Sequence, residues 1–120
     1  MRRRRRAQAT ETSTSGHHNV YVVLLDDVVN SLRKVSRANP DRDPAKPSVY
    51  VGLTGLDPEE RFQNHKLGIR SVSLVRYHGV RLMPELYAHL NPMPYEAAAQ
   101  MERDLAEDLR REGYAVMGGH

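Results

Sequence analysis

Hydrophobic and polar positions divide the chain into short strands and amphipathic helices. The apolar, β-branched run at 19–25 predicts a buried strand, and the run at 48–53 predicts a second one. Between them, apolar residues at helical spacing followed by three prolines predict a helix and a loop over 26–47. If the two strands pair antiparallel in a suitable register, Tyr21 and Tyr50 share one face of the sheet.

The second half of the chain predicts further helices and strands. Asp57 is placed to cap a helix that has Pro58 at its first position and ends near Gly68. The later segments are predicted as a third strand at 71–82, a short helix and loop at 83–94, the clearest helix at 95–113 and a short last strand at 114–117. Together these segments predict an α+β fold.

Charge separates a basic N-terminal tail from a nearly neutral domain. Residues 1–18 hold five arginines and one acid, lack apolar periodicity and predict a disordered tail. Residues 19–120 hold 13 basic and 14 acidic side chains and are expected to form one domain. The arginines either add sequence-independent affinity for nucleic acid through counterion release or reflect a start site assigned too far upstream. Both interpretations stay open.

Composition excludes several classes of protein. There is no cysteine, which excludes disulfides and thiolate metal sites and fits the reducing cytoplasm. No apolar run approaches the ~18 residues of a membrane span, and no apolar segment follows the basic N-terminus as in a secretory signal. We therefore expect a cytoplasmic protein with no membrane partner.

On the last predicted helix, one acid lies among apolar positions. Glu102 falls within the apolar arc that includes Ala98, Leu105 and Leu109. A carboxylate that faces a core without a partner is costly, so a cation, a metal or a pocket opening is expected beside it. A structural salt bridge to Arg61 or another arginine is the alternative.

Five other residues are considered together with this glutamate because of their order along the chain. Arg61 and His65, four positions apart, lie on one face of their predicted helix. Gly52, inside a predicted strand, marks a bulge or a close approach of another group. Taken alone, the Arg61–His65 pair and the tyrosines Tyr21 and Tyr50 are common in ordinary domains, and Gly52 is more telling. Their order along the chain is more informative.

This order resembles the GIY-YIG nuclease superfamily over most of the chain, from about 19 to 116. The tripeptide "NVY" stands where that family has its first motif, and "YVG" matches the second closely. Three departures accompany the resemblance. Asn19 replaces the first glycine, 26–47 looks like an inserted helix and loop, and the asparagine often found after the last helix has no evident counterpart. The resemblance implies a small, mainly antiparallel sheet of about three strands flanked by helices.

The resemblance also implies a divalent-metal-dependent endonuclease that hydrolyses phosphodiester bonds of DNA. Glu102 would bind Mg²⁺ or Mn²⁺, and Arg61 would contact the phosphate. The groups that would orient or deprotonate water are Tyr21, Tyr50 and His65. A tyrosine with a pKa near ~10 is a poor base at neutral pH, so the base is not assigned to one residue.

A stretch with five basic and no acidic residues, 61–83, contains further candidates for phosphate contact. Besides Arg61 they are Lys66, Arg70, Arg76 and Arg81. The alternative is a solvated surface that acids elsewhere balance. Because no second, sequence-reading domain is evident, target choice would come from DNA shape or from a protein partner.

Two other functions compete with the nuclease. One is a catalytically inactive GIY-YIG-like module that binds nucleic acid or a partner. The other is a zinc-binding domain that uses histidines, although their spacing matches no known ligand pattern. The histidines are His17, His18, His65, His78, His89 and His120.

Overall fold

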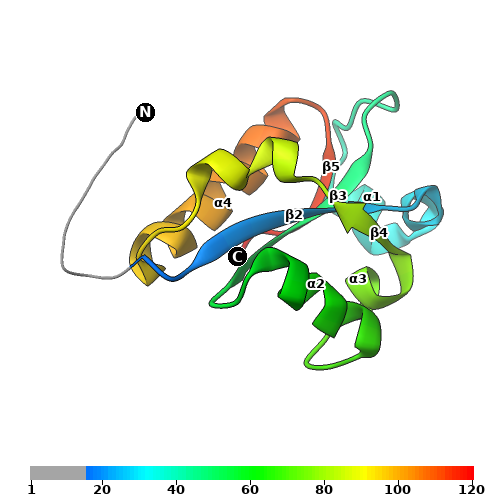
Figure 1. The fold of residues 1–120 in the computed structure, drawn as a ribbon. Coiled ribbons are helices and arrows are strands. Elements are labelled where there is room, and N and C mark those ends of the chain that lie inside the picture. The colour runs from blue at the N-terminus through cyan, green and yellow to red at the C-terminus, as the bar shows by residue number, and fades with distance from the viewer. Residues whose placement is uncertain (1–15) are drawn as a thin grey trace.

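The computed structural model describes residues 16–120, which form a four-stranded sheet with helices on both faces (Figure 1). Most of the predicted tail, 1–18, lies outside the described residues. His18 is described, and its backbone exchanges two hydrogen bonds of 2.9 Å with Met93. Backbone pairing therefore begins one residue before the segment that the sequence assigned to the domain.

The sheet contains four strands of both orientations. They are β2 (Asn19–Leu25), β3 (Ser48–Thr54), β4 (Gly79–Leu82) and β5 (Ala115–Gly118), in the spatial order β4-β2-β3-β5. β2 is antiparallel to β3 and β4, whereas β5 is parallel to β3. The α+β class is confirmed, but the prediction of about three mainly antiparallel strands is wrong. A parallel partner arrives through a long crossover connection, which a local apolar pattern does not reveal.

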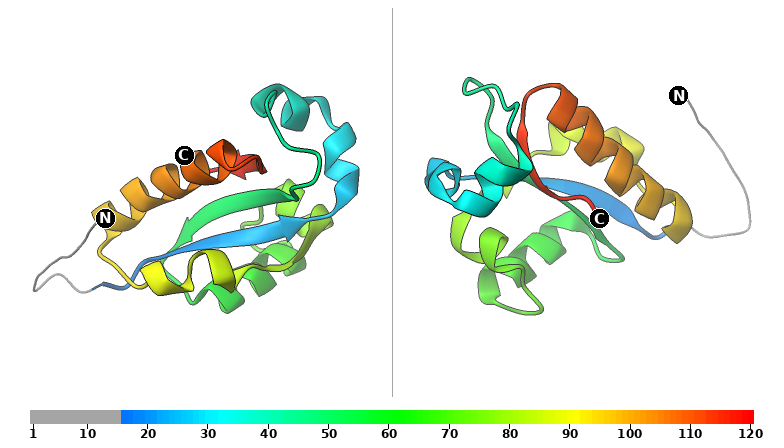
Figure 2. Two further views of the ribbon diagram at one scale, coloured as in Figure 1. Left: turned by 90° about the horizontal axis from the view of Figure 1, so that it is seen from above. Right: turned by 180° about the vertical axis from the view of Figure 1, so that it is seen from behind.

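Helices cover both faces of this sheet. They are α1 (Arg33–Ala38), α2 (Pro58–Leu67), α3 (Ser73–His78) and α4 (Tyr95–Arg111), with 3₁₀ turns η2 (Asp27–Ser31), η3 (Pro84–Leu86) and η4 (Ala88–Leu90). α4 lies on one face, and α2 and α3 lie on the other (Figures 1 and 2). No helix within 16–120 has the length and apolar character needed to cross a membrane.

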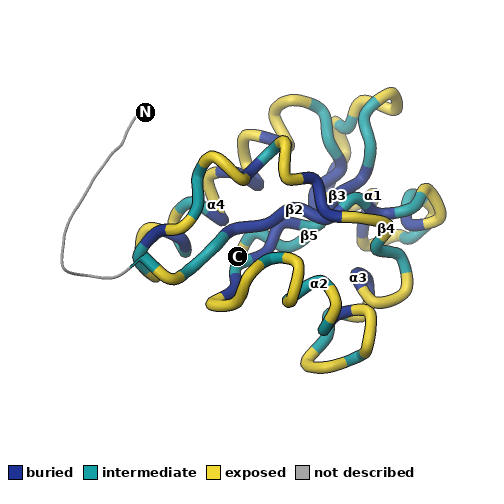
Figure 3. The backbone as a smooth tube through the Cα atoms, in the orientation of Figure 1, coloured by how far each residue is buried: buried dark blue, intermediate teal, exposed yellow. Residues whose placement is uncertain are grey.

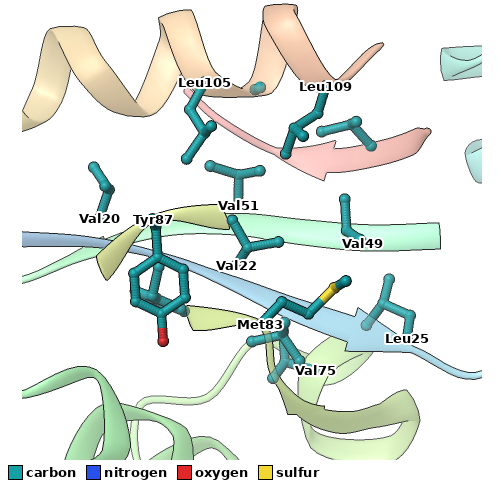
Figure 4. Packing of buried hydrophobic residues seen from close by; sticks show 14 of the residues in the cluster. Val20, Val22, Leu25, Val49, Val51, Val75, Met83, Tyr87, Leu105 and Leu109 are labelled. Atoms are coloured by element: carbon teal, nitrogen blue, oxygen red, sulfur yellow. The ribbon is translucent and has the colours of Figure 1, made fainter. Parts of the chain in front are cut away.

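The main core lies between α4 and the sheet. Leu105 and Leu109 point from α4 toward Val51 of β3 (Figure 4), and the two central strands are buried along most of their length (Figure 3). Because side chains alternate along a strand, the neighbours of these core residues point to the other face. Tyr21 and Tyr50 therefore face α2.

The segment 71–82 corrects one prediction. It was expected to form one strand, but it forms α3 followed by the short strand β4. The helix starts where Val75 N–H donates to the Val72 carbonyl at 3.0 Å, and it buries Leu74 and Val75. A short apolar run with β-branched residues fits a strand and a buried helix equally well, so periodicity alone does not separate them.

The segment 26–47 contains a helix and a loop as predicted, but its helix is divided. η2 ends at Leu32, which is extended with ψ of 128°, and α1 begins after it. Asp26 caps η2, because its carboxylate accepts the Val28 N–H at 3.0 Å. Valine, asparagine and serine are weak helix formers, and a run of them ends the first turn before an α-helix is established.

Candidate functional site

Two tyrosines meet on the face of the sheet that α2 covers. In the β2–β3 register, Tyr21 lies opposite Gly52, and Val23 lies opposite Tyr50. The two tyrosine rings are therefore diagonal neighbours, with centroids 6.3 Å apart. The predicted shared face is confirmed.

Gly52 provides the space for this arrangement. A Cβ built at Gly52 would lie 2.5 Å from the hydroxyl oxygen of Tyr21 and 2.8 Å from its Cε1. Both distances are far below van der Waals contact. The predicted close approach is confirmed, and the approaching group is the ring of Tyr21.

The helix α2 places the imidazole of His65 beside the two tyrosines. The Asp57 carboxylate accepts the Glu59 N–H at 2.9 Å at the start of α2, and Gly68 ends the helix with φ of 80°. These caps place His65 in the last turn, where it is fully buried. Its Nε2 lies 2.9 Å from the Tyr21 hydroxyl, and its ring centroid lies 6.2 Å from that of Tyr50.

The protonation of His65 follows from its second contact. The backbone N–H of Val72 donates to Nδ1 at 3.1 Å, so this nitrogen is the acceptor. The proton of the neutral imidazole is then on Nε2, which donates to the Tyr21 hydroxyl oxygen. Because both ring nitrogens are engaged, His65 has no free lone pair with which to accept a proton from water.

Burial keeps the aromatic groups of the site neutral. Desolvation is the main reason why the pKa of both Tyr21 and Tyr50 is raised. Each tyrosine also experiences the negative charge of Glu102, which raises its pKa further, and the positive charge of Arg61, which lowers it. Desolvation and the Arg61 charge together lower the pKa of His65 to about 4.

The lowered pKa of His65 predicts a loss of stability in acid. Between pH 6.5 and about 4 the unfolded chain protonates this histidine and the folded protein does not, so folding stability falls as the pH falls through this window. The full difference is roughly 3 kcal/mol, at 1.36 kcal/mol per pKa unit. Urea unfolding at pH 7 and pH 4.5 should show a larger loss for the wild type than for His65→Gln. An NMR titration midpoint of His65 near its ordinary value would contradict the prediction.

Arg61 lies on α2, one turn before His65. Its guanidinium donates to the Arg70 carbonyl at 2.9 Å and, more weakly, to the Ile69 carbonyl at 3.4 Å. These bonds hold the loop after α2, while its charge acts on both tyrosines and on His65. Arg61 and His65, the pair predicted to share one helix face, therefore both act on the tyrosines.

Glu102 lies on α4, which covers the other face of the sheet, and its charge acts on both tyrosines. It is 7% exposed, and burial is the main reason why its pKa is raised. Among residues 16–120 no arginine lies within ion-pair distance of Glu102, so the alternative of a structural salt bridge to Arg61 or another arginine is not found there. The carboxylate also receives no hydrogen bond from this part of the chain, which leaves its oxygens available to a hard cation.

The other basic residues predicted to contact phosphate make different contacts within the protein. Lys66 Nζ donates to the Arg76 and Gly79 carbonyls, both at 2.8 Å, and thereby ties α2 to β4. Arg81 pairs with Glu85 at 3.2 Å. Arg76 stacks over Tyr77 at 5.2 Å, and Arg70 is exposed after the end of α2. Arg70 and Arg76 are thus the two best placed to meet a phosphate backbone.

The zinc interpretation gains no support from the described part of the chain. Residues 16–120 contain no group of three or more histidine, aspartate or glutamate side chains that could hold a metal ion. His65 is engaged on both nitrogens, and Nδ1 of His78 lies 3.2 Å from the Asp26 carboxylate.

Sequence reasoning missed two parts of the site. Val72, which orients His65, contributes only a backbone N–H and leaves no signal in the sequence. Gly118, at the end of β5, lies against the Tyr50 ring, and the next residue, Gly119, lies against the backbone of α4. The two consecutive glycines are the sequence signal of this close approach.

Comparison of the chain with protein-family models, with curated proteins and with solved structures finds no match.

Proposed function

We propose that this protein is a divalent-metal-dependent DNA endonuclease of the GIY-YIG type. One observation carries the proposal. A phenol–imidazole pair, Tyr21 and His65, and a second phenol, Tyr50, meet on one face of the sheet. The charges of the Arg61 guanidinium and of the Glu102 carboxylate, which has no ion-pair partner in the described part of the chain, both act on the two phenols. These are the groups that phosphodiester hydrolysis requires, and they come from four separate elements.

Glu102 fits the role of metal ligand. It is a nearly buried carboxylate with no ion-pair partner among residues 16–120, which is a suitable anchor for Mg²⁺ or Mn²⁺ that keeps most of its water ligands. When bound, such an ion polarises the phosphate and stabilises the leaving oxygen. The residues around Glu102 then have to place the phosphate and the attacking water.

Each of the other groups has a different role toward the phosphate or the attacking water, which follows from its chemistry. Arg61 offers a planar fork of donors to the phosphate oxygens, where charge grows in the transition state. Tyr21 accepts a hydrogen bond from His65, so its own hydroxyl proton is free to bind an oxygen of the substrate or of water. Tyr50 presents a second phenol beside it. His65 acts as a positioning residue, because it holds the Tyr21 hydroxyl and cannot itself receive the proton.

DNA is the proposed partner of this face. Arg70 and Arg76 add positive charge beside the end of α2, where they would follow the phosphate backbone without reading sequence. Substrate choice would then come from DNA shape or from a protein partner.

The proposal is tested by incubating the full chain with duplex, nicked and branched DNA in the presence of Mg²⁺, Mn²⁺ or EDTA. Cleavage that requires the metal supports a nuclease. Binding without cleavage under every condition would replace it with the inactive binding module.

Arg61→Lys is expected to slow single-turnover cleavage at least ~100-fold, the scale of one lost preorganised donor. The lysine keeps the charge but loses the bidentate fork, so DNA affinity should change little. Loss of the bonds to the loop carbonyls should lower stability by about 1 kcal/mol. Arg37→Lys, on the exposed surface of α1, is the matched control and should leave cleavage unchanged. Normal cleavage by Arg61→Lys would remove this arginine from the mechanism.

A further inference from the structure

Large apolar side chains are exposed where α2 ends, on the side of the molecule that also carries α3. Leu67 and Ile69 are 67% and 50% exposed, and they lie on either side of Gly68, the residue that ends α2. Tyr77, on α3, is 66% exposed. The two helices pack side by side (Figure 1). Several large apolar side chains exposed close together indicate a place where another molecule binds.

Arg76 connects Tyr77 to the end of α2. Its guanidinium lies over the Tyr77 ring, with Cζ 5.2 Å from the ring centroid. The same guanidinium packs against Gly68, since a Cβ built there would lie 2.6 Å from Cζ of Arg76. The Arg76 backbone is also fixed, because Lys66 Nζ donates to its carbonyl oxygen at 2.8 Å. The Tyr77 ring is therefore supported by Arg76 on one face, and its large exposed fraction leaves the opposite face to solvent.

The same surface is basic. Residues 61–83 hold five basic and no acidic side chains. Arg70 directly follows Ile69 and has φ of 48°, a backbone conformation that side chains disfavour. The Arg61 guanidinium holds it there by donating to the Arg70 carbonyl at 2.9 Å. A surface of this charge complements a polyanion, and the bond from Arg61 connects it to the phosphate-binding group of the proposed active site.

We propose that Tyr77 forms a stacking site for unpaired bases of single-stranded DNA, with Arg70 and Arg76 beside it for the phosphates. The inference rests on the proposed function in taking DNA as the substrate, and it adds the class of DNA. Exposed aromatic rings in a basic surface bind single strands because every base has a π face that can stack, whatever the sequence. In a duplex these faces are already stacked on one another. The stacking site should therefore select DNA that has unpaired nucleotides near the cleaved bond.

A second copy of the chain is a less suitable occupant of this surface. An interface that pairs the surface with itself would bring Arg70 and Arg76 close to the same arginines of the other copy. Like charges that face each other across an interface are costly. A strand of DNA brings the opposite charge, together with the flat bases that an exposed tyrosine ring can bind.

The test is fluorescence anisotropy of a labelled DNA strand of about 12 nucleotides, single or annealed to its complement, with the full chain in EDTA. EDTA prevents metal-dependent cleavage, and the basic tail is common to all the proteins. Tyr77→Ala should weaken binding of the single strand at least ~5-fold and binding of the duplex less than about twofold. Tyr77→Phe keeps the ring and should bind the single strand within about twofold of the wild type. Tyr95→Ala is the matched control, because it removes another exposed tyrosine, at the start of α4, and it should change neither.

Salt dependence separates stacking from charge. Arg70→Gln removes one positive charge and should make the slope of log affinity against log salt less steep by about 0.7 for the single strand. Tyr77→Ala removes no charge and should leave that slope and the melting temperature unchanged. The proposal is overturned if Tyr77→Ala binds the single strand like the wild type, if it loses as much affinity for the duplex, or if Tyr95→Ala loses as much. An unchanged slope in Arg70→Gln would overturn the phosphate contact.

Further measurements separate this inference from the nuclease and from a protein interface. If the single-strand pattern is as expected but no DNA is cleaved with Mg²⁺ or Mn²⁺, the stacking site stands and the nuclease fails. If DNA is cleaved and Tyr77→Ala changes neither cleavage nor single-strand binding, the nuclease stands and the stacking site is overturned. Sedimentation velocity that shows a dimer for the wild type and a monomer for Tyr77→Ala, with unchanged DNA binding, would assign the surface to a second copy instead.

Discussion

Gly52→Ala is expected to destabilise the protein by about 3 kcal/mol, because overpacking and a lost hydrogen bond act together. The new methyl group would occupy space that the Tyr21 ring fills, 2.5 Å from its hydroxyl oxygen. Tyr21 is 1% exposed and bonded to His65, so it has no free direction in which to move. At ~4–8 °C per kcal/mol for a domain of this size, the melting temperature should fall by more than 10 °C.

Gly55→Ala is the matched control for this prediction. A Cβ there would lie 3.4 Å from Nε2 of His18, an ordinary contact, so the same change should alter stability by less than about 0.5 kcal/mol. A double-mutant cycle identifies the cause. In a Tyr21→Val background the space is empty, and Gly52→Ala should cost much less there. Additive losses in the double mutant would show that the Tyr21 contact is not the reason.

Elements with strong local signals were predictable from the sequence. The two central strands are apolar and β-branched, α2 has a cap at each end, and α4 carries a long amphipathic pattern. The inward position of Glu102 followed from the same helical periodicity. All of these features depend on residues that are close together in the chain, so they can be predicted from a single sequence.

Features that depend on distant contacts were not predictable. α3 is set by the packing of Leu74 and Val75, and nothing in their local pattern distinguishes this helix from a strand. The parallel pairing of β5 with β3 joins segments that are far apart in the chain. The tautomer of His65 depends on a single backbone N–H, that of Val72. The meeting of Tyr21, Tyr50 and His65 was therefore predictable, but their hydrogen bonding was not.

Glu102→Gln is expected to abolish metal-dependent cleavage, with a loss of at least ~1000-fold, while the protein stays folded. The amide has the shape of the carboxylate but lacks the charge that holds a divalent ion. The loss is at the upper end of the range for one electrostatic group in an active site. Single-turnover cleavage by the variant in Mg²⁺ and in Mn²⁺ measures it. Full activity would exclude Glu102 as the metal ligand.

The same substitution should have the opposite effect on stability without metal. Burial raises the pKa of Glu102 in the folded protein, so the folded state holds this proton more tightly than the unfolded chain. Its contribution to stability is then present in acid and is lost as the pH rises from the unfolded value through the raised folded value. Glutamine does not titrate. The variant should gain stability over the wild type as the pH rises from 4 to 7 in EDTA.

Divalent metal should reverse that order, because an ion that binds only the folded wild type stabilises it by mass action. Urea unfolding at pH 7, with and without MnCl₂, should therefore show a metal-dependent gain for the wild type and none for Glu102→Gln. Glu107→Gln is the matched control: its side chain is 67% exposed and pairs with Arg111 at 3.5 Å, so it should keep both cleavage and the metal-dependent gain. Equal stabilisation of wild type and Glu102→Gln by Mn²⁺ would place the ion elsewhere, and Glu102 would then be a buried acid without a catalytic role.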